Sequence, residues 1–270
     1  MIKGKKFIAP GAWFSMYYPA DWTEADGGED SFLFYNPDCW TGNFRISAFR
    51  GGRDDYGEHT VMEELRHNAD ARPVKIGTLT CAYTVETFVE DGQEYDNHQW
   101  TAGLSDVEFE ISFAVERGAS VQPALDIIGT LELRQPNMKY APEVIPVRLM
   151  EIFRIDDAYD NVQRLIKQQL KKDVRGDESD VPNMQTLADS GVLNPRKRDA
   201  WIDMGIALCV IATNVAEGFE WRTLIDGNRE DPVLLCEADG RVIDPLKLLW
   251  SHVKAGEKAD VEAAYDSIFG

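Results

Sequence analysis

Cysteine and histidine are scarce in this chain, and neither occurs at the spacing of a ligand pair. The four cysteines form no Cys-x-x-Cys pair, and the four histidines form no His-x-x-x-His pair. These absences exclude a zinc knuckle, a thioredoxin-like redox site and the disulfide framework of a small secreted protein. We therefore predict reduced thiols in the cytoplasm, no metal site and no cofactor. The residues concerned are Cys39, Cys81, Cys209, Cys236, His59, His67, His98 and His252.

Positive charge is also scarce. The chain has 28 lysines and arginines against 47 aspartates and glutamates, which gives a formal net charge of −19. Such a chain repels phosphate backbones and anionic lipid, so neither nucleic acid nor a membrane is expected as a partner. An acidic surface serves solubility, or it attracts a basic protein. Composition alone leaves both explanations open.

Long hydrophobic runs are missing. The amino-terminal stretch reaches Pro10 and Gly11 after only three apolar residues, so it lacks the apolar core of an export signal. No run approaches the length of a membrane-spanning helix. The chain is 270 residues long and 44% hydrophobic, enough to fill one large core or two ordinary ones.

Catalytic motifs are absent as well. There is no Gly-x-Ser-x-Gly elbow, and the glycine pairs at 27–28 and 51–52 lack the spacing of a phosphate loop. Two acidic clusters in glycine-rich turns, at 54–58 and 226–231, lack the spacing of a calcium loop. We predict solvated loop charge and no catalytic residue. The alternative is a metal-dependent hydrolase that uses loop carboxylates between the domains.

The clearest pattern present is the alternation VEFEISFAVE at 107–116, typical of a strand with one buried face. Asp91-Gly92 upstream predicts a two-residue hairpin turn, which places Cys81 opposite Ala102 and Tyr83 opposite Trp100. A second turn at Ser105-Asp106 continues the meander. In this register Cys81 and His98 are about 13 Å apart at roughly 3.3 Å per residue, so they cannot form a catalytic dyad.

Five aromatic residues gather in WFSMYYPADW at 13–22. As a strand, this stretch sends Phe14, Met16 and Tyr18 to one side, and we expect it to join the sheet of the meander. Further strands are predicted over 32–36 and 43–49, and helices over 58–71 and 121–133.

The stretches FSMYYPADW, FLFYNP and GNFRISAF, followed by a helix and a three-strand meander, resemble the Mog1/PsbP-like fold over residues 7–134. The resemblance implies an α/β/α sandwich around an antiparallel sheet and a role in binding or assembly instead of catalysis. The whole chain also resembles two-domain bacterial proteins of unknown function.

The second half of the chain is mainly helical. Amphipathic or apolar periodicity predicts helices over 147–172, 196–218, 245–253 and 259–269. Between them, 219–226, 232–237 and 240–244 read as short strands joined by Asp-Gly turns. A proline-rich linker is placed over 136–146. The predicted fold class is α+β, with an α/β/α sandwich with an antiparallel sheet over 1–135 and a mainly helical domain with a small β-hairpin sheet over 147–270.

Tryptophan and tyrosine are favoured interface anchors, and arginine grips carboxylates. We therefore predict a non-catalytic protein-binding module, with an inhibitor or immunity-type role against a basic protein as its concrete form. A third hypothesis is a small-ligand sensor with an aromatic pocket at the rim of the sandwich. The sequence carries no signal for oligomeric state. The predicted binding residues are Tyr17, Trp22, Trp40, Trp221, Arg222, Asp226 and Arg229.

Overall fold

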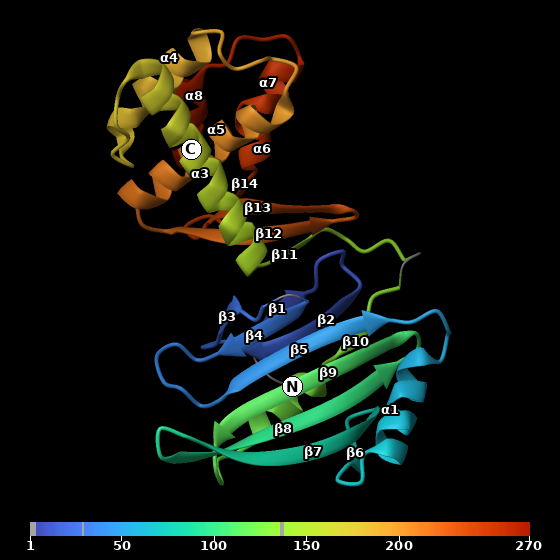
Figure 1. The fold of residues 1–270 in the computed structure, drawn as a ribbon. Helices are drawn as coiled ribbons and strands as arrows, with labels where there is room; N and C mark the ends of the chain where they lie inside the picture. Colours follow the sequence, from blue (N-terminus) through green and yellow to red (C-terminus); the bar gives the residue numbers. More distant parts are fainter. Residues whose placement is uncertain (1–3, 29, 136–137) are drawn as a thin grey trace. The chain divides into compact units, whose positions relative to one another are not determined.

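The computed structural model describes residues 4–28, 30–135 and 138–270. The chain divides into two compact units, Met1–Lys139 and Tyr140–Gly270, which are described separately (Figure 1). The two residues 136 and 137 of the predicted linker lie outside the described part of the chain. No described helix is both long and apolar enough to cross a membrane.

A seven-stranded antiparallel sheet dominates the first unit, in the order β3-β4-β5-β9-β8-β7-β6 (Figure 1). The strands are β3 (Thr23–Asp26), β4 (Ser31–Tyr35), β5 (Asn43–Arg50), β6 (Arg72–Ile76), β7 (Leu79–Glu90), β8 (Gln93–Leu104) and β9 (Val107–Glu116). The predicted meander register is confirmed, since Cys81 lies opposite Ala102, Tyr83 opposite Trp100, and Trp100 opposite Ile111. A slip of one residue would have turned every apolar side chain away from the core.

The aromatic stretch at 13–22 does not join this sheet, which corrects the prediction. β2 (Phe14–Pro19) pairs with β1 (Gly4–Ile8) on one side and β10 (Glu132–Leu133) on the other, in a separate three-stranded sheet. Its inward side chains pack on the larger sheet, as the Phe14 and Phe109 rings show at 5.3 Å between centroids. Alternation fixed which side of β2 is buried, but it carries no information about which strands are its partners.

Two helices lie on opposite sides of the large sheet. α1 (Tyr56–His67) packs against β8 and β9 at the end where Leu104 turns into Val107, where Gly57 and Gly103 allow backbones to touch. α2 (Gln122–Ile128) packs against β2 and buries Ala124, Ile127 and Ile128. The helix predicted over 121–133 thus ends at Ile128, because the chain then turns through Gly129 and enters β10.

The second unit contains a four-stranded antiparallel sheet in the order β11-β12-β13-β14. Its strands are β11 (Glu143–Pro146), β12 (Phe219–Asp226), β13 (Arg229–Cys236) and β14 (Val242–Ile243). β11 falls inside the predicted linker 136–146 and pairs with β12, which corrects that prediction. Prolines are compatible with this position because β11 is an edge strand, where the missing N–H leaves the ladder intact.

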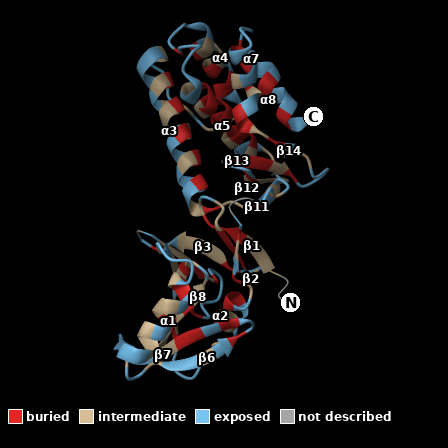
Figure 2. Cartoon of the chain, turned by 90° about the vertical axis from the view of Figure 1, so that its right-hand side faces the viewer, coloured by how far each residue is buried: buried red, intermediate tan, exposed pale blue. Residues whose placement is uncertain are grey.

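Helices make up most of the second unit, and α5 is the most buried of them (Figure 2). The described helices are α3 (Leu149–Leu170), η1 (Glu178–Asp180), α4 (Val181–Asp189), α5 (Arg198–Val215), α6 (Pro245–Leu248), α7 (Trp250–Lys254) and α8 (Val261–Phe269). The helix predicted over 245–253 is divided at Leu249. The polar stretch 173–182 is predicted to be a loop, but η1 and the first two residues of α4 form its second half. The α+β class is confirmed: an antiparallel sheet first, then a mainly helical unit with a small sheet.

Candidate functional site

The outer face of the seven-stranded sheet is only partly covered. α1 lies over one end of β8 and β9, while the opposite ends of β7 and β8 extend to the hairpin at Asp91 and Gly92 (Figure 1). Side chains that point away from the core along β5, β7, β8 and β9 include five carboxylates and one guanidinium. These are Glu86, Glu90, Glu108, Glu110 and Glu116, and Arg45. The outer face is therefore strongly acidic.

Three aromatic rings form a cluster on this face near the hairpin. Phe88 on β7 lies directly opposite Tyr95 on β8, and their rings stack at 5.4 Å between centroids. Trp40, from the loop before β5, meets the Tyr95 ring edge to face at 5.9 Å. Its indole Nε1 donates a hydrogen bond of 2.8 Å to Asn43 Oδ1, which fixes the ring. Trp40 and Phe88 are each 40% exposed, so the ring cluster of Trp40, Phe88 and Tyr95 presents apolar surface to solvent.

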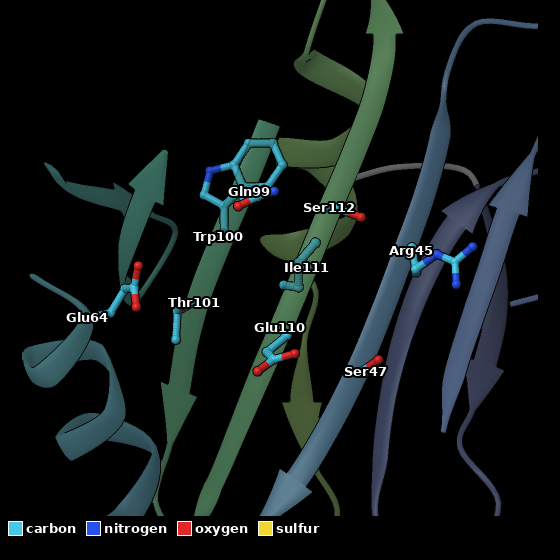
Figure 3. A pocket seen from close by; sticks show the side chains of 9 residues that line it. All are labelled: Arg45, Ser47, Glu64, Gln99, Trp100, Thr101, Glu110, Ile111 and Ser112. Atoms are coloured by element: carbon cyan, nitrogen blue, oxygen red, sulfur yellow. The ribbon is translucent and has the colours of Figure 1, made fainter. Parts of the chain in front are cut away.

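A polar pocket of about 350 Å³ lies between this cluster and α1 (Figure 3). Cross-strand pairs build it, because Arg45 lies opposite Ser112 and Ser47 opposite Glu110. Its lining residues are Arg45, Ser47, Glu64, Gln99, Trp100, Thr101, Glu110, Ile111 and Ser112. Trp100 and Ile111 belong to the buried face of the sheet, so the exposed lining is hydrogen-bonding and charged.

Beneath α1 the acidic face carries a perturbed carboxyl group. The Tyr56 hydroxyl donates a hydrogen bond of 3.1 Å to Glu108 Oε2. Burial raises the pKa of Glu108; the Tyr56 hydrogen bond offsets part of this, and the nearby Glu110 carboxylate raises the pKa further. Like charges on one sheet face thus already repel each other.

The sulfur and imidazole considered for nucleophilic chemistry lie apart, as the predicted register requires. His98 lies opposite Val85 and Phe113, and its Nδ1 shares a hydrogen bond of 2.7 Å with the Tyr83 hydroxyl. Burial lowers the pKa of His98, with partial compensation from Asp96. Burial also raises the pKa of the Cys81 thiol to about 11. Cys81 is therefore protonated at neutral pH and is not an activated nucleophile.

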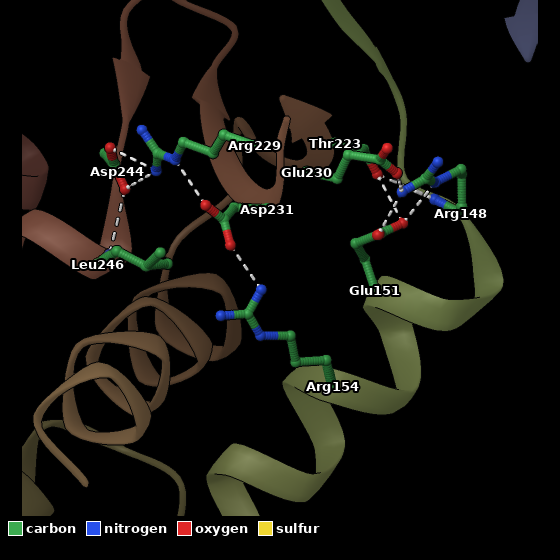
Figure 4. A network of polar contacts seen from close by, with 9 residues as sticks. All are labelled: Arg148, Glu151, Arg154, Thr223, Arg229, Glu230, Asp231, Asp244 and Leu246. Carbon is green, nitrogen blue, oxygen red and sulfur yellow. Dashed lines mark hydrogen bonds and ion pairs between the residues drawn. The ribbon is translucent and has the colours of Figure 1, made fainter. Parts of the chain in front are cut away.

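In the second unit, a buried ion-pair network joins the start of α3 to β12 and β13 (Figure 4). Arg148 is 2% exposed and donates to Glu151 Oε1 at 2.6 Å and to Glu230 Oε2 at 2.7 Å. The Thr223 hydroxyl donates to Glu151 Oε2 at 3.1 Å. Burial alone would lower the pKa of Arg148, but the hydrogen bonds and charges of Glu151 and Glu230 outweigh it and raise the pKa. These groups satisfy one another, which is typical of a structural network.

A second set of ion pairs continues along the same sheet (Figure 4). Asp231 accepts from Arg154 at 2.6 Å and from Arg229 at 2.5 Å, and Arg229 also donates to both oxygens of Asp244 at 2.8 Å. Burial alone would raise the pKa of Asp231, but these arginines outweigh burial and lower it. The hydrolase hypothesis required carboxylates with raised pKa values, so Asp231 does not fit it. Residues 4–28, 30–135 and 138–270 contain no group of three or more candidate ligands placed to hold a metal.

The predicted aromatic binding residues have different environments. Tyr17 and Trp40 are 39% and 40% exposed, as a docking role requires. Trp22 is only 3% exposed and stacks on Phe113 at 6.3 Å, so its predicted binding role is wrong. The backbone N–H of Trp22 donates a hydrogen bond of 3.1 Å to the carbonyl oxygen of Pro19, in a turn that brings the indole back into the core.

The predicted binding residues of the β12–β13 hairpin also differ in their surroundings. Trp221 is half-buried and packs against the apolar cores of the second unit. Arg222 forms an ion pair with Glu220. Arg229 forms ion pairs with Asp231 and Asp244, which corrects the prediction that Arg229 binds a carboxylate of a partner. Asp226 is exposed at the turn.

Sequence reasoning missed Phe88 and Tyr95. A signal for them was present, because the predicted hairpin register that pairs Glu90 with Gln93 also pairs Phe88 with Tyr95. Both residues then fall on a face whose other members on β7 and β8 are small or polar. Two aromatic residues on a polar face could have been recognised as an exposed pair.

The architecture defines an α+β chain of two compact units, and comparisons with known proteins place it in a family. A family model described as a domain of unknown function, DUF3805, matches residues 2–156, and a second such model, DUF3806, matches residues 180–265. The chain belongs to the DUF3805 family. The expected resemblance to two-domain proteins of unknown function is thus confirmed. No protein with a curated description matches the chain.

The chain is similar to solved structures. A crystal structure from Bacteroides thetaiotaomicron VPI-5482 is 52% identical, covers 99% of each chain and has a TM-score of 0.95. LpqN, involved in cell envelope biogenesis of Mycobacterium tuberculosis, matches 49% of this chain and 86% of its own at 11% identity and a TM-score of 0.32. Cyanobacterial PsbP (CyanoP) from Synechocystis sp. PCC 6803 matches 50% of this chain and 95% of its own at 14% identity and a TM-score of 0.23.

Proposed function

We propose that this chain is a non-catalytic protein-binding module that uses the outer face of the seven-stranded sheet. The observation that carries the proposal is the ring cluster of Trp40, Phe88 and Tyr95. Apolar rings cost free energy when they are left in water, and tryptophan and tyrosine are enriched among the residues that dominate binding energy. Around the cluster lies a polar surface of the kind that forms the rim of a protein interface.

Charge indicates the kind of partner. Five carboxylates and one guanidinium on the outward positions of four strands, in a chain of net charge −19, favour a basic protein. Complementary charge accelerates encounter and suppresses wrong partners. An inhibitor or immunity-type role against a basic protein is the concrete form of this proposal.

A cytoplasmic location is part of the proposal. Its support is that none of the four cysteines is in a disulfide and that three of them, Cys81, Cys209 and Cys236, are buried. Reduced thiols are usual in the cytoplasm, whereas secreted proteins usually form disulfides.

The test is capture of partners from a lysate of the source organism, followed by binding measurements between the purified proteins. Trp40→Ala removes the indole at one end of the cluster and leaves the Phe88–Tyr95 pair in place. Tyr17→Ala is the matched control, because Tyr17 is an equally exposed aromatic residue on the other sheet. We expect a partner that binds wild type and Tyr17→Ala, loses at least tenfold in affinity with Trp40→Ala and is released by salt. Equal binding by all three proteins would contradict the proposal.

A further inference from the structure

We propose that the ring cluster of Trp40, Phe88 and Tyr95 is a subsite for a cationic side chain, arginine or lysine, of the partner protein. This inference rests on the proposed function and names the chemical group that the surface recognises. A cation over an aromatic face is attracted by the ring quadrupole, and nearby carboxylates add direct charge attraction.

The strand register places three carboxylates around the rings. Glu86 and Glu90 are two residues before and after Phe88 on the same strand, so they share its face at about 7 Å along the strand. Glu116 on β9 lies directly opposite Tyr95. Phe88 thus has a carboxylate on each side along its strand, and Tyr95 has one on the neighbouring strand.

These carboxylates are not neutralised within the described residues. The carboxylate groups of Glu86, Glu90 and Glu116 make no hydrogen bond or ion pair with any of them. Arg117, the cation that follows Glu116 in sequence, is paired at 2.7 Å with Glu94, which points to the opposite face of the sheet. Unpaired charge beside exposed rings is the arrangement that a partner's cation would complete.

Elsewhere the same unit already pairs arginine with aromatic rings. The Arg72 guanidinium lies 5.0 Å from the centroid of Tyr83, and Arg50 lies 5.3 Å from the centroid of Trp13. Among described residues, no arginine or lysine is placed in this way over the ring cluster. The cluster therefore differs from these internal sites in having its cation position open to solvent.

The rings are also held in place before any partner arrives. The indole of Trp40 is fixed by its hydrogen bond to Asn43, and Tyr95 lies between Trp40 and Phe88. Preformed rings lose little conformational entropy on binding.

The experiment uses the full chain labelled with 5-fluorotryptophan and observed by fluorine NMR. The probe is a capped peptide of alternating glycine and three arginines. One control peptide has citrulline in place of arginine, which keeps the shape and removes the charge, and another has lysine. Trp40→Phe assigns the Trp40 signal by its loss. The buried Trp22 provides an internal reference.

We expect the arginine peptide to shift the Trp40 signal, with no shift of Trp22 and at least fivefold weaker binding of the citrulline peptide. The double variant Glu86→Gln/Glu116→Gln should weaken arginine binding by about three- to tenfold, since each exposed charge contributes modestly. The lysine peptide shows whether any cation or preferentially guanidinium is bound.

Three results would overturn the inference: no Trp40 shift with either cationic peptide, equal binding of the citrulline peptide, or no effect of the double variant. The glutamine variants keep side-chain shape, and their thermal melting shows that they fold. Failure here is distinguishable from failure of the proposed function. A partner protein that is lost with Trp40→Ala but retained by the double variant would support protein binding and reject cation recognition.

Discussion

At the scale of single residues, the alternation of apolar and polar side chains predicted burial correctly within strands but not in the turns that follow them. Phe109, Ile111 and Phe113 are buried as their spacing indicates. Trp22 is buried against expectation, because the chain turns after Pro19 and returns the indole to the core. A pattern of side-chain faces holds only while the strand continues, so a residue after the strand's last pair cannot be placed from it.

Glu108 provides a prediction about pH at this scale. Its pKa in the folded chain is raised above its ordinary value of 4.5 by burial and by Glu110. A raised pKa means that the folded state holds the proton more tightly, so this group's stabilising contribution is present below pH 4.5 and is lost as pH rises through the folded value. Glu108→Gln mimics the protonated form and still accepts from Tyr56.

The expected result is that the variant gains stability relative to wild type as pH rises from 4 to 7. Urea unfolding of both proteins at several pH values measures the difference. Glu90→Gln, at an exposed strand end, is the control and should show no such trend. A difference between wild type and Glu108→Gln that is constant across this range would contradict the assigned pKa direction.

At the scale of elements, hairpins were predictable and distant pairings were not. Asp91-Gly92 fixed the β7–β8 register, because a two-residue turn leaves only one pairing of its strands. The pairing of β2 with β10 joins residues more than a hundred positions apart, and no local signal encodes it. The same holds for β11 and β12. The ring cluster depends on β7 and β8, so its strand part could be derived, whereas the position of the Trp40 loop could not.

The contact between α1 and the sheet gives a prediction about packing. A Cβ added at Gly103 would lie 2.0 Å from Gly57 O, so Gly103→Ala must push α1 away from β8. We expect a loss of about 1–3 kcal/mol in unfolding free energy, as for other overpacked positions. Gly52→Ala is the matched control, since nothing lies within 4 Å of its added Cβ. Denaturant unfolding measures both variants, and equal stability would contradict the close approach.

The buried network of the second unit gives a prediction about charge. Glu151→Gln leaves the buried guanidinium of Arg148 with only Glu230 as a charged partner among the groups described above. We expect a loss of about 3 kcal/mol or more, because removing one member of a buried pair strands the other. The exposed pair of Arg53 and Asp55 provides the control, and Asp55→Asn should cost far less stability than Glu151→Gln, because an exposed ion pair contributes little. Similar losses in the two variants would show that the network is not buried in solution.

At the scale of the whole molecule, the composition and the positions of the prolines indicated the division into two units and the sign of the surface charge. The prolines at 136–146 marked the change between units, although part of that stretch forms β11 and belongs to the second unit's sheet. Of the predicted binding residues, Trp40 lies in the ring cluster. Trp22 is buried in the core of the first unit, and Arg229 is ion-paired within the second. The net charge predicted an acidic surface, but it could not predict which face carries the carboxylates. A sum over the whole chain contains no information about position.

The most direct test of the account is the affinity of the captured basic partner for wild type, Trp40→Ala and Tyr17→Ala, measured by titration calorimetry at low and at high salt. We predict at least tenfold weaker binding for Trp40→Ala alone, and weaker binding of every variant at high salt. Equal affinity of wild type and Trp40→Ala at both salt concentrations would contradict the claim that the outer face of the seven-stranded sheet is the binding surface.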